Sequence, residues 1–225
     1  MPPVTDRVAV VIPARPAEPF LIEAIDSVLR QPHVAELVVA THLGDDPGRS
    51  AVAEHPDARV SLVISDGPSA GENLDAGVAR TSAEWLAFLD ADDCWPDGRI
   101  SVALDAVAAA PSTELVLGRQ RAMTAESQLL PATAPAPLLG AVLITRAAAC
   151  RIGPFGADLL AQMRWLLRAR ELAVPAVELT DVVLHRRSHA GNLSRVQRPE
   201  LHTAYLALAR ERVIRQRIPS ENRDG

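Results

Sequence analysis

Short apolar segments and amphipathic segments alternate along the first half of the chain. An amphipathic helix is predicted over residues 21–29, because its apolar residues recur at intervals of three and four. The capping-box spacing of Ser69 and Glu72 predicts a second helix that ends near Arg80. Four apolar runs have the length of buried strands: residues 7–12, 36–40, 60–64 and 85–89.

The second half continues this alternation less regularly. The elements predicted there are a helix at 96–110, a strand at 114–117, an extended Pro/Ala loop at 131–137, a strand at 140–144, a helix at 158–172, a strand at 177–184, a basic loop at 185–192 and a helix at 199–217. Strands that alternate with helices favour right-handed crossovers between neighbouring parallel strands. We therefore predict an α/β fold with a mostly parallel, doubly wound sheet and flanking helices.

Composition and charge narrow the class of protein. The 225 residues, 48% of them hydrophobic, suit a single globular domain. The formal net charge of -5 argues against a general nucleic-acid-binding protein. Cys94 and Cys150 lack metal-ligand spacing and are too few for a disulfide framework. Because no signal peptide and no transmembrane segment are evident, we expect a soluble, cytoplasmic protein.

The apolar run at 85–89 ends in three carboxylates within four residues, Asp90, Asp92 and Asp93. Ligands of open α/β sheets bind at the carboxyl ends of strands, and carboxylate oxygens are the ligands that hard divalent cations prefer. One interpretation is therefore a site for Mg²⁺ or Mn²⁺. The other is a solvated acidic turn in front of the helix that starts near Pro96. Residues 7–20 contain neither a dinucleotide-binding nor a P-loop glycine pattern, so phosphate would have to be bound in another way.

The order of these elements and their motifs resembles the family 2 glycosyltransferases of the GT-A fold, over roughly residues 7–195. The matching segments are Val10-Val11-Ile12-Pro13, Ile25-Asp26-Ser27-Val28-Leu29-Arg30-Gln31, Phe88-Leu89-Asp90-Ala91-Asp92-Asp93 with Trp95, Gly140 to Arg146, and Gly153-Pro154-Phe155. The resemblance implies a single GT-A domain over residues 1–225. It divides that domain into a donor-binding half (about 7–118), an acceptor-binding half (about 119–195) and a C-terminal helix and tail (196–225).

The same resemblance implies a transferase that takes a sugar from a nucleotide-diphosphate donor, with inversion, and passes it to an unknown acceptor. Asp90 would lie near the ribose of the donor, and Asp92 would bind Mn²⁺ or Mg²⁺, with Asp93 in support. A divalent cation would stabilise the charge that develops on the departing diphosphate. The general alternative is a degenerate GT-A domain that binds a nucleotide or a partner protein without transferring sugar.

Further donor contacts are implied by the resemblance. Pro13 ends the first strand and is one candidate. Asp75 is another, although the Ala-Arg-Asn of the family reads Asn73-Leu74-Asp75 here, a departure that removes one polar contact to the donor. In the segment 185–192, Arg186 would bind phosphate oxygens, and His189 would lie close to the metal. For the histidines of this segment, a solvated loop position is the open alternative.

Two further positions depart from the pattern of the family. The acidic pair that normally ends the second strand, and contacts the nucleotide base, reads Thr41-His42. The helix that normally carries the general base reads Ala161-Gln162-Met163-Arg164-Trp165. Neither an amide nor a guanidinium is a general base at neutral pH. Asp158 is the nearest carboxylate and is our candidate base, with capping of the helix N-terminus as its alternative role.

The predicted C-terminal helix carries several arginines near its end. A basic amphipathic helix docks to an acidic partner protein or to a membrane surface in some proteins, and is a solvated face in others. The sequence leaves both interpretations open. A nucleotidyltransferase on a related sheet is a third function class, although Pro13-Ala14-Arg15-Pro16 lacks the glycines that such an enzyme needs in its first loop.

Overall fold

A computed structural model describes residues 7–42, 47–189, 191, 202–204, 206 and 208. The chain divides into two compact units, Met1–Ser188 and His189–Gly225. All strands and named helices belong to the first unit. In the second unit, residues 202–204, 206 and 208 of the predicted C-terminal helix are helical. The rest of that helix, with its terminal arginines, lies outside the described residues.

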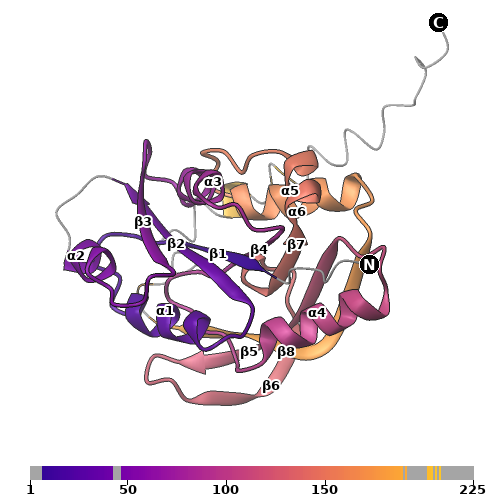
Figure 1. The fold of residues 1–225 in the computed structure, drawn as a ribbon, viewed down its shortest axis with the longest axis horizontal. Coiled ribbons are helices and arrows are strands. Elements are labelled where there is room, and N and C mark those ends of the chain that lie inside the picture. The colour runs from indigo at the N-terminus through magenta and orange to yellow at the C-terminus, as the bar shows by residue number, and fades with distance from the viewer. Residues whose placement is uncertain are drawn as a thin grey trace, which may run out of the picture. The chain divides into compact units, whose positions relative to one another are not determined.

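The first unit is built on an eight-stranded sheet (Figure 1). Its strands are β1 (Val8–Pro13), β2 (Val34–His42), β3 (Val60–Ser65), β4 (Trp85–Phe88), β5 (Leu115–Thr124), β6 (Leu129–Pro135), β7 (Val142–Thr145) and β8 (Ala176–Ser188). The strand order is β3-β2-β1-β4-β7-β5-β6, and β8 pairs with β5. Pairs β1–β2, β2–β3, β1–β4 and β5–β8 are parallel, whereas β4–β7, β5–β7 and β5–β6 are antiparallel. The predicted mostly parallel α/β sheet is confirmed.

Helices cover both faces of this sheet. They are α1 (Leu21–Leu29), α2 (Pro47–Ala53), α3 (Ala70–Arg80), α4 (Arg99–Ala109), α5 (Arg146–Ile152) and α6 (Ala161–Glu171), with a short 3-10 turn at Leu139–Ala141. Figure 1 shows α1 and α4 on one side of the sheet and α3, α5 and α6 on the other. Alternate residues of β1 and β4 therefore enter two different apolar cores. This double burial explains why both strands read as unbroken apolar runs in the sequence.

The capping box of α3 forms as the sequence predicts. The Ser69 hydroxyl accepts the backbone N–H of Glu72 at 3.1 Å, and the Glu72 carboxylate accepts the backbone N–H of Ser69 at 3.1 Å. The helix predicted from Pro96 instead begins at Arg99, because Gly98 precedes it in the left-handed conformation, with φ at 76°. Helix α6 likewise begins at Ala161, three residues after the predicted start.

The segment 131–137, predicted to be a Pro/Ala loop, is largely the strand β6, and this prediction was wrong. Strand β6 pairs only with β5 and ends the path of the sheet. Proline is tolerated on such an edge, because one side of the strand donates no hydrogen bond to a neighbour. The register of β6 on β5 shifts between the pairs Arg121–Thr133 and Met123–Leu129, and Pro131 lies within that shift.

The segment 185–192 was predicted to be a basic loop, but residues 185–188 continue β8. Parallel pairing with β5 runs on through Arg121↔His185 to Thr124↔Ser188, so the backbone of these basic residues is extended and fixed. The helices α2 and α5 were not predicted at all. Both have seven residues, too few for a clear apolar period.

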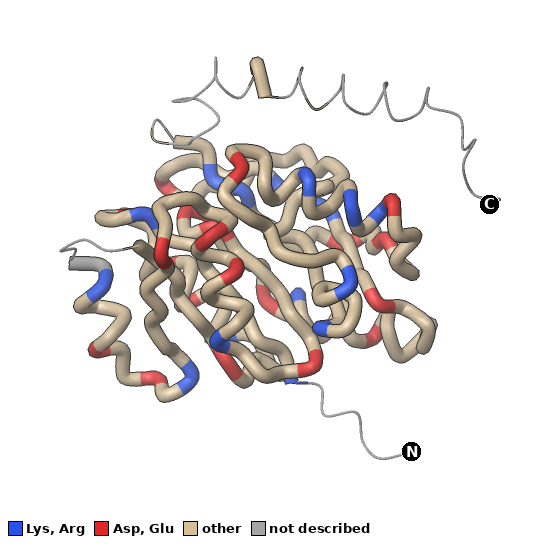
Figure 2. Tube along the Cα trace, turned by 90° about the horizontal axis from the view of Figure 1, so that it is seen from above, with Lys and Arg blue, Asp and Glu red and all other residues tan. Residues whose placement is uncertain are grey.

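Acidic and basic residues are interspersed along the elements of the first unit (Figure 2). Among the described residues, no helix is both long enough and apolar enough to cross a lipid bilayer.

Candidate functional site

The three carboxylates predicted from the sequence lie in one tight turn at the carboxyl end of β4. Leu89 still donates its N–H to the carbonyl of Val11 in β1, and the N–H of Asp93 then closes the turn on the carbonyl of Asp90 at 3.0 Å. Strand β4 has β1 as a parallel neighbour on one side and β7 as an antiparallel neighbour on the other. The strand order β3-β2-β1-β4 reverses between β1 and β4, so the turn lies at the carboxyl end of a strand beside this reversal, which is a common position for a ligand site.

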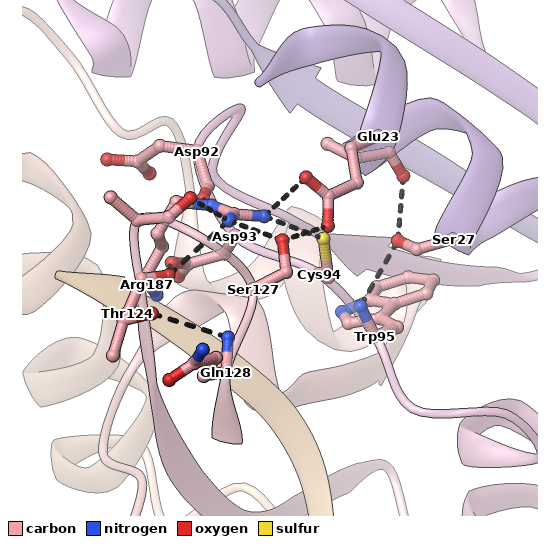
Figure 3. A network of polar contacts seen from close by, with 12 residues as sticks. Glu23, Ser27, Asp92, Asp93, Cys94, Trp95, Thr124, Ser127, Gln128 and Arg187 are labelled. Atoms are coloured by element: carbon pink, nitrogen blue, oxygen red, sulfur yellow. Dashed lines mark hydrogen bonds and ion pairs between the residues drawn. The ribbon is translucent and has the colours of Figure 1, made fainter. Parts of the chain in front are cut away.

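Asp93 faces inward rather than toward a ligand. Its side chain is buried, with 4% of the residue exposed, and Oδ1 accepts the backbone N–H of Arg187 at 2.7 Å. The Nε of Arg187 donates to the backbone carbonyl of Asp92 at 2.9 Å. The carboxylate of Asp92 points away from the Arg187 guanidinium (Figure 3). Asp92 is therefore better placed than Asp93 to meet a ligand.

Asp90 is held from the opposite half of the unit. The side-chain amide of Gln162, on α6, donates to Oδ1 of Asp90 at 3.0 Å. The sequence marked Gln162 only as the amide in the region of the expected general base. The contact joins residues separated by 72 positions, and no sequence pattern indicated it.

Three carboxyl groups are crowded together in the turn and act on one another's ionisation. Burial raises the pKa of the Asp90 carboxyl, and the neighbouring charge of Asp92 adds to the increase. Burial also raises the pKa of Asp93 well above its ordinary value, with further increases from Asp90 and Asp92. Arg186, which is exposed, is the guanidinium that lowers the pKa of both carboxyls. Desolvated like charges of this kind favour a bound cation.

The carboxylate oxygens of the turn suit a divalent metal that takes its other ligands from water and from a substrate. Within the described part of the chain, no three His, Cys, Asp or Glu side chains form a metal-binding group. Asp93 accepts the backbone N–H of Arg187, and Asp90 and Asp92 place two further carboxylates in the same turn. Mg²⁺ is usually held in this way, by one or two carboxylates together with water and phosphate oxygens.

Pro13 and Asp75 are the two further candidates for contact with the donor. Pro13 is the last residue of β1 and pairs with Ala40 of β2, at the same edge of the sheet as the turn. Asp75, on α3, accepts two backbone N–H groups, from Phe155 and Gly156, at 2.9 Å each. The carboxylate of Asp75 therefore connects α3 to the loop after α5, and its contact with a donor stays a prediction.

The candidate base Asp158 lies at the start of α6. Its Oδ1 accepts the backbone N–H of Leu160 at 2.6 Å, and its Oδ2 pairs with Nε of Arg164 at 3.2 Å. These are the contacts of a residue that stabilises a helix N-terminus, which was the alternative role. With 45% of its side chain exposed, Asp158 is also accessible to solvent.

The remaining positions are described only in part. Thr41, at the end of β2, is buried, and its hydroxyl has no hydrogen-bond partner among the described residues. Asp45 and Asp46, which follow it in the sequence, lie outside the described residues. His189 opens the second unit, where its Nδ1 accepts the N–H of Gly191 at 3.3 Å. Its proposed place near a metal stays a prediction.

Comparisons with known proteins agree with this geometry. The sequence model described as Glycosyl transferase family 2 matches residues 9–136. Over 90 residues, the chain is 31% identical to the Escherichia coli UDP-Glc:alpha-D-GlcNAc-diphosphoundecaprenol beta-1,3-glucosyltransferase WfgD. These residues are 39% of this chain and 36% of WfgD.

Two solved structures share the fold. The mannosyltransferase PcManGT from Pyrobaculum calidifontis, in complex with GDP-Man and Mn²⁺, matches with a TM-score of 0.64 and 21% identity, over 83% of this chain and 58% of PcManGT. S. aureus TarS 1-349, in complex with UDP-GlcNAc, matches with a TM-score of 0.63 and 15% identity, over 83% of this chain and 60% of TarS 1-349. The chain thus spans only part of each relative, and it has the GT-A fold.

The family's sequence model covers more than half of the chain, including β4 and the acidic turn that follows it, and the protein therefore belongs to glycosyl transferase family 2.

Proposed function

We propose that the protein transfers a sugar from a nucleotide-diphosphate donor to an acceptor, with inversion, and that it uses Mn²⁺ or Mg²⁺. The observation that carries this proposal is the turn from Asp90 to Asp93, which presents carboxylates at the carboxyl end of β4 in a GT-A fold. The relatives support the donor class, since the structure of PcManGT contains GDP-Man and Mn²⁺ and that of TarS contains UDP-GlcNAc.

Each residue of the turn has a proposed part. Asp92 binds the metal through its carboxylate, and Asp90, held by Gln162, faces the ribose of the donor. Arg186 faces the diphosphate, because its exposed guanidinium already acts on the charges of Asp90 and Asp93. Asp93 supports the metal site indirectly, by fixing the turn against β8. The metal, when bound, supplies positive charge that stabilises the departing diphosphate.

In the same proposal, the two halves of the domain bind different substrates. Residues 7–118 bind the donor, and residues 119–195 bind the acceptor. Asp158 is the proposed general base for the acceptor hydroxyl, and it would have to exchange its contact with Arg164 for one with the acceptor. Replacement of Asp158 by Asn tests this role. If turnover is unaffected, Asp158 is not the base and its function is to stabilise α6.

The test of donor binding is calorimetry with UDP-glucose, UDP-GlcNAc and GDP-mannose, each with and without Mn²⁺. At least one nucleotide sugar should bind, more tightly with the metal than without it. Asp92→Ala should abolish the metal-dependent part of the affinity. The matched control is Asp105→Ala, which removes an exposed carboxylate from α4 and should change nothing.

Two outcomes separate the possible failures. If no nucleotide binds in the presence of metal, and Asp92→Ala has no effect, the proposed function is wrong. If a nucleotide sugar binds but neither transfer nor slow donor hydrolysis is detected, the domain binds the donor without catalysis.

A further inference from the structure

Four segments that are far apart in the sequence meet at the side chain of Arg187 (Figure 3). They are α1, the acidic turn after β4, the turn between β5 and β6, and the end of β8, on which Arg187 itself lies. We propose that Arg187 is a positioning residue, which holds the acidic turn in its ligand-binding geometry, and that Glu23 and Ser127 fix the guanidinium in place. The part of this inference that concerns ligands rests on the proposed function; the part that concerns the turn does not.

Arg187 binds the turn at Asp92 and Asp93, through its side chain and its backbone N–H respectively. Its backbone N–H donates to Oδ1 of Asp93 at 2.7 Å, and its side-chain Nε donates to the carbonyl of Asp92 at 2.9 Å. The adjacent residue Cys94 pairs in both directions with His185 on the same strand, at 3.1 and 2.8 Å. The segment from the Asp92 carbonyl to Cys94 is therefore bound to β8.

The guanidinium is enclosed on its other sides. Nη1 donates to the carbonyl of Ala125 at 3.0 Å and to the hydroxyl of Ser127 at 2.9 Å, both in the β5–β6 turn. The ring of Phe20 lies 4.3 Å from the guanidinium carbon. The Arg187 side chain is 0% exposed, so water cannot replace any of these contacts. Only the planar, five-donor fork of arginine reaches all of these acceptors at once.

The counter-charge comes from α1. Oε2 of Glu23 lies 2.7 Å from Nη2 of Arg187, and Oε1 of Glu23 accepts the hydroxyl of Ser127 at 2.9 Å. Glu23 is 45% exposed while its partner is fully buried. Glu23 can thus be neutralised without opening a cavity, which makes it the milder of the two positions to change. Since burying an unpaired charge is costly, neutral Glu23 should loosen the guanidinium and the turn that it holds.

Amide hydrogen exchange on the protein without ligand tests the inference directly. The reporters are the N–H groups of Asp93, Cys94 and Trp95, which donate to Asp90, His185 and Ser27 respectively. In Arg187→Lys these amides should exchange at least about tenfold faster than in the wild type, while amides in β1 and β2 keep their rates. In Glu23→Gln the increase should be about threefold to tenfold at the same amides.

Glu114→Gln is the matched control, because Glu114 pairs with Arg151 at 2.5 Å on the surface, away from the turn in the sequence and in the sheet. It should leave all three reporter amides unchanged. If Arg187→Lys speeds exchange everywhere, Glu23→Gln alone decides. Wild-type rates at the three amides in Glu23→Gln, or in a folded Arg187→Lys, would overturn the inference.

A second measurement tests the consequence for ligands. Mn²⁺ is titrated in the presence of UDP and, separately, of GDP. Wild type, Glu23→Gln and Glu114→Gln are compared at temperatures equally far below their own melting temperatures. Glu23→Gln should weaken binding about threefold to tenfold, and Glu114→Gln should not weaken it. Unchanged affinity in Glu23→Gln would overturn the inference that the position of Arg187 affects ligand binding. If the wild type binds Mn²⁺ in the presence of neither UDP nor GDP, the proposed function fails, and the exchange result still decides the positioning role.

Discussion

Replacing Asp75 tests whether this carboxylate holds the fold together or contacts the donor. Both of its oxygens accept backbone N–H groups, those of Phe155 and Gly156, at 2.9 Å. The Phe155 ring is stacked on Trp165 with centroids 4.8 Å apart, and meets Phe88 at 5.5 Å. Asp75 therefore ties α3 to the loop that carries one member of the aromatic cluster under the sheet.

The magnitude follows from the two bonds. A hydrogen bond to a charged group contributes about 1.5–3 kcal/mol, so the pair is worth about 3–6 kcal/mol at most. Asp75 is only half-buried, and water can partly replace the lost acceptor. We expect Asp75→Ala to lower the free energy of unfolding by about 2–4 kcal/mol, which for a chain of this size lowers the Tm by about 4–16 °C. Asp75→Asn keeps one acceptor and should lose about half as much.

Urea unfolding measures this change, with the m-value as a check that the unfolding transition has not altered. Asp105→Ala, on the exposed face of α4, is the control and should stay within about 0.5 kcal/mol of the wild type. If Asp75→Ala is equally neutral while nucleotide-sugar binding is lost, the structural role is refuted and the donor contact is supported. If Asp75→Asn loses stability but still binds the nucleotide sugar, the structural role is supported and the donor contact is refuted.

Three further predictions concern packing, thiol chemistry and helix capping. Gly71→Ala should destabilise by about 1–3 kcal/mol in urea unfolding, despite the better helix propensity of alanine; the new Cβ would lie 1.9 Å from the backbone oxygen of Gly156, and an unchanged unfolding midpoint would refute the tight packing of α3 on that loop. Iodoacetamide at pH 8 should label the exposed Cys150 and leave Cys94 unmodified in the native protein, because burial raises the pKa of the Cys94 thiol to about 12; equal labelling rates by mass spectrometry would contradict this. Ser69→Ala removes the acceptor of the α3 capping box and should lower the free energy of unfolding by about 1 kcal/mol, whereas Ser69→Asn, which keeps an acceptor without adding a charge beside Glu72, should lower it less.

The parts of the fold that the sequence predicted correctly are those set by local chemistry. The unbroken apolar run before Asp90 had to be a strand covered on both faces, and α1 and α3 carried their period and their cap in the sequence. The strand β6 was missed because its prolines and alanines favour a loop locally. Only its pairing with β5 at the edge of the sheet makes it a strand, and that pairing is a tertiary interaction.

The candidate site was predicted to the same extent. The position of the acidic residues followed from their place after a buried strand. Their different surroundings did not: Asp93 accepts a backbone N–H from a strand 94 residues away, and Asp90 meets Gln162 on α6. Nothing in the sequence indicated that Arg186 and its neighbour Arg187 have different surroundings. In the fold one is exposed and the other is fully buried, because successive residues of β8 face opposite sides of the strand.

The composition of β6 has a consequence for the protein at high concentration. A strand at the end of a sheet offers unpaired N–H and C=O groups, onto which a second chain can add a strand. Two of the seven residues of β6, Pro131 and Pro135, have no N–H to offer, and Pro131 lies within the register shift that interrupts the pairing of β6 with β5. We expect these prolines to protect a sheet with exposed leucines at positions 129 and 130 from aggregating through this edge.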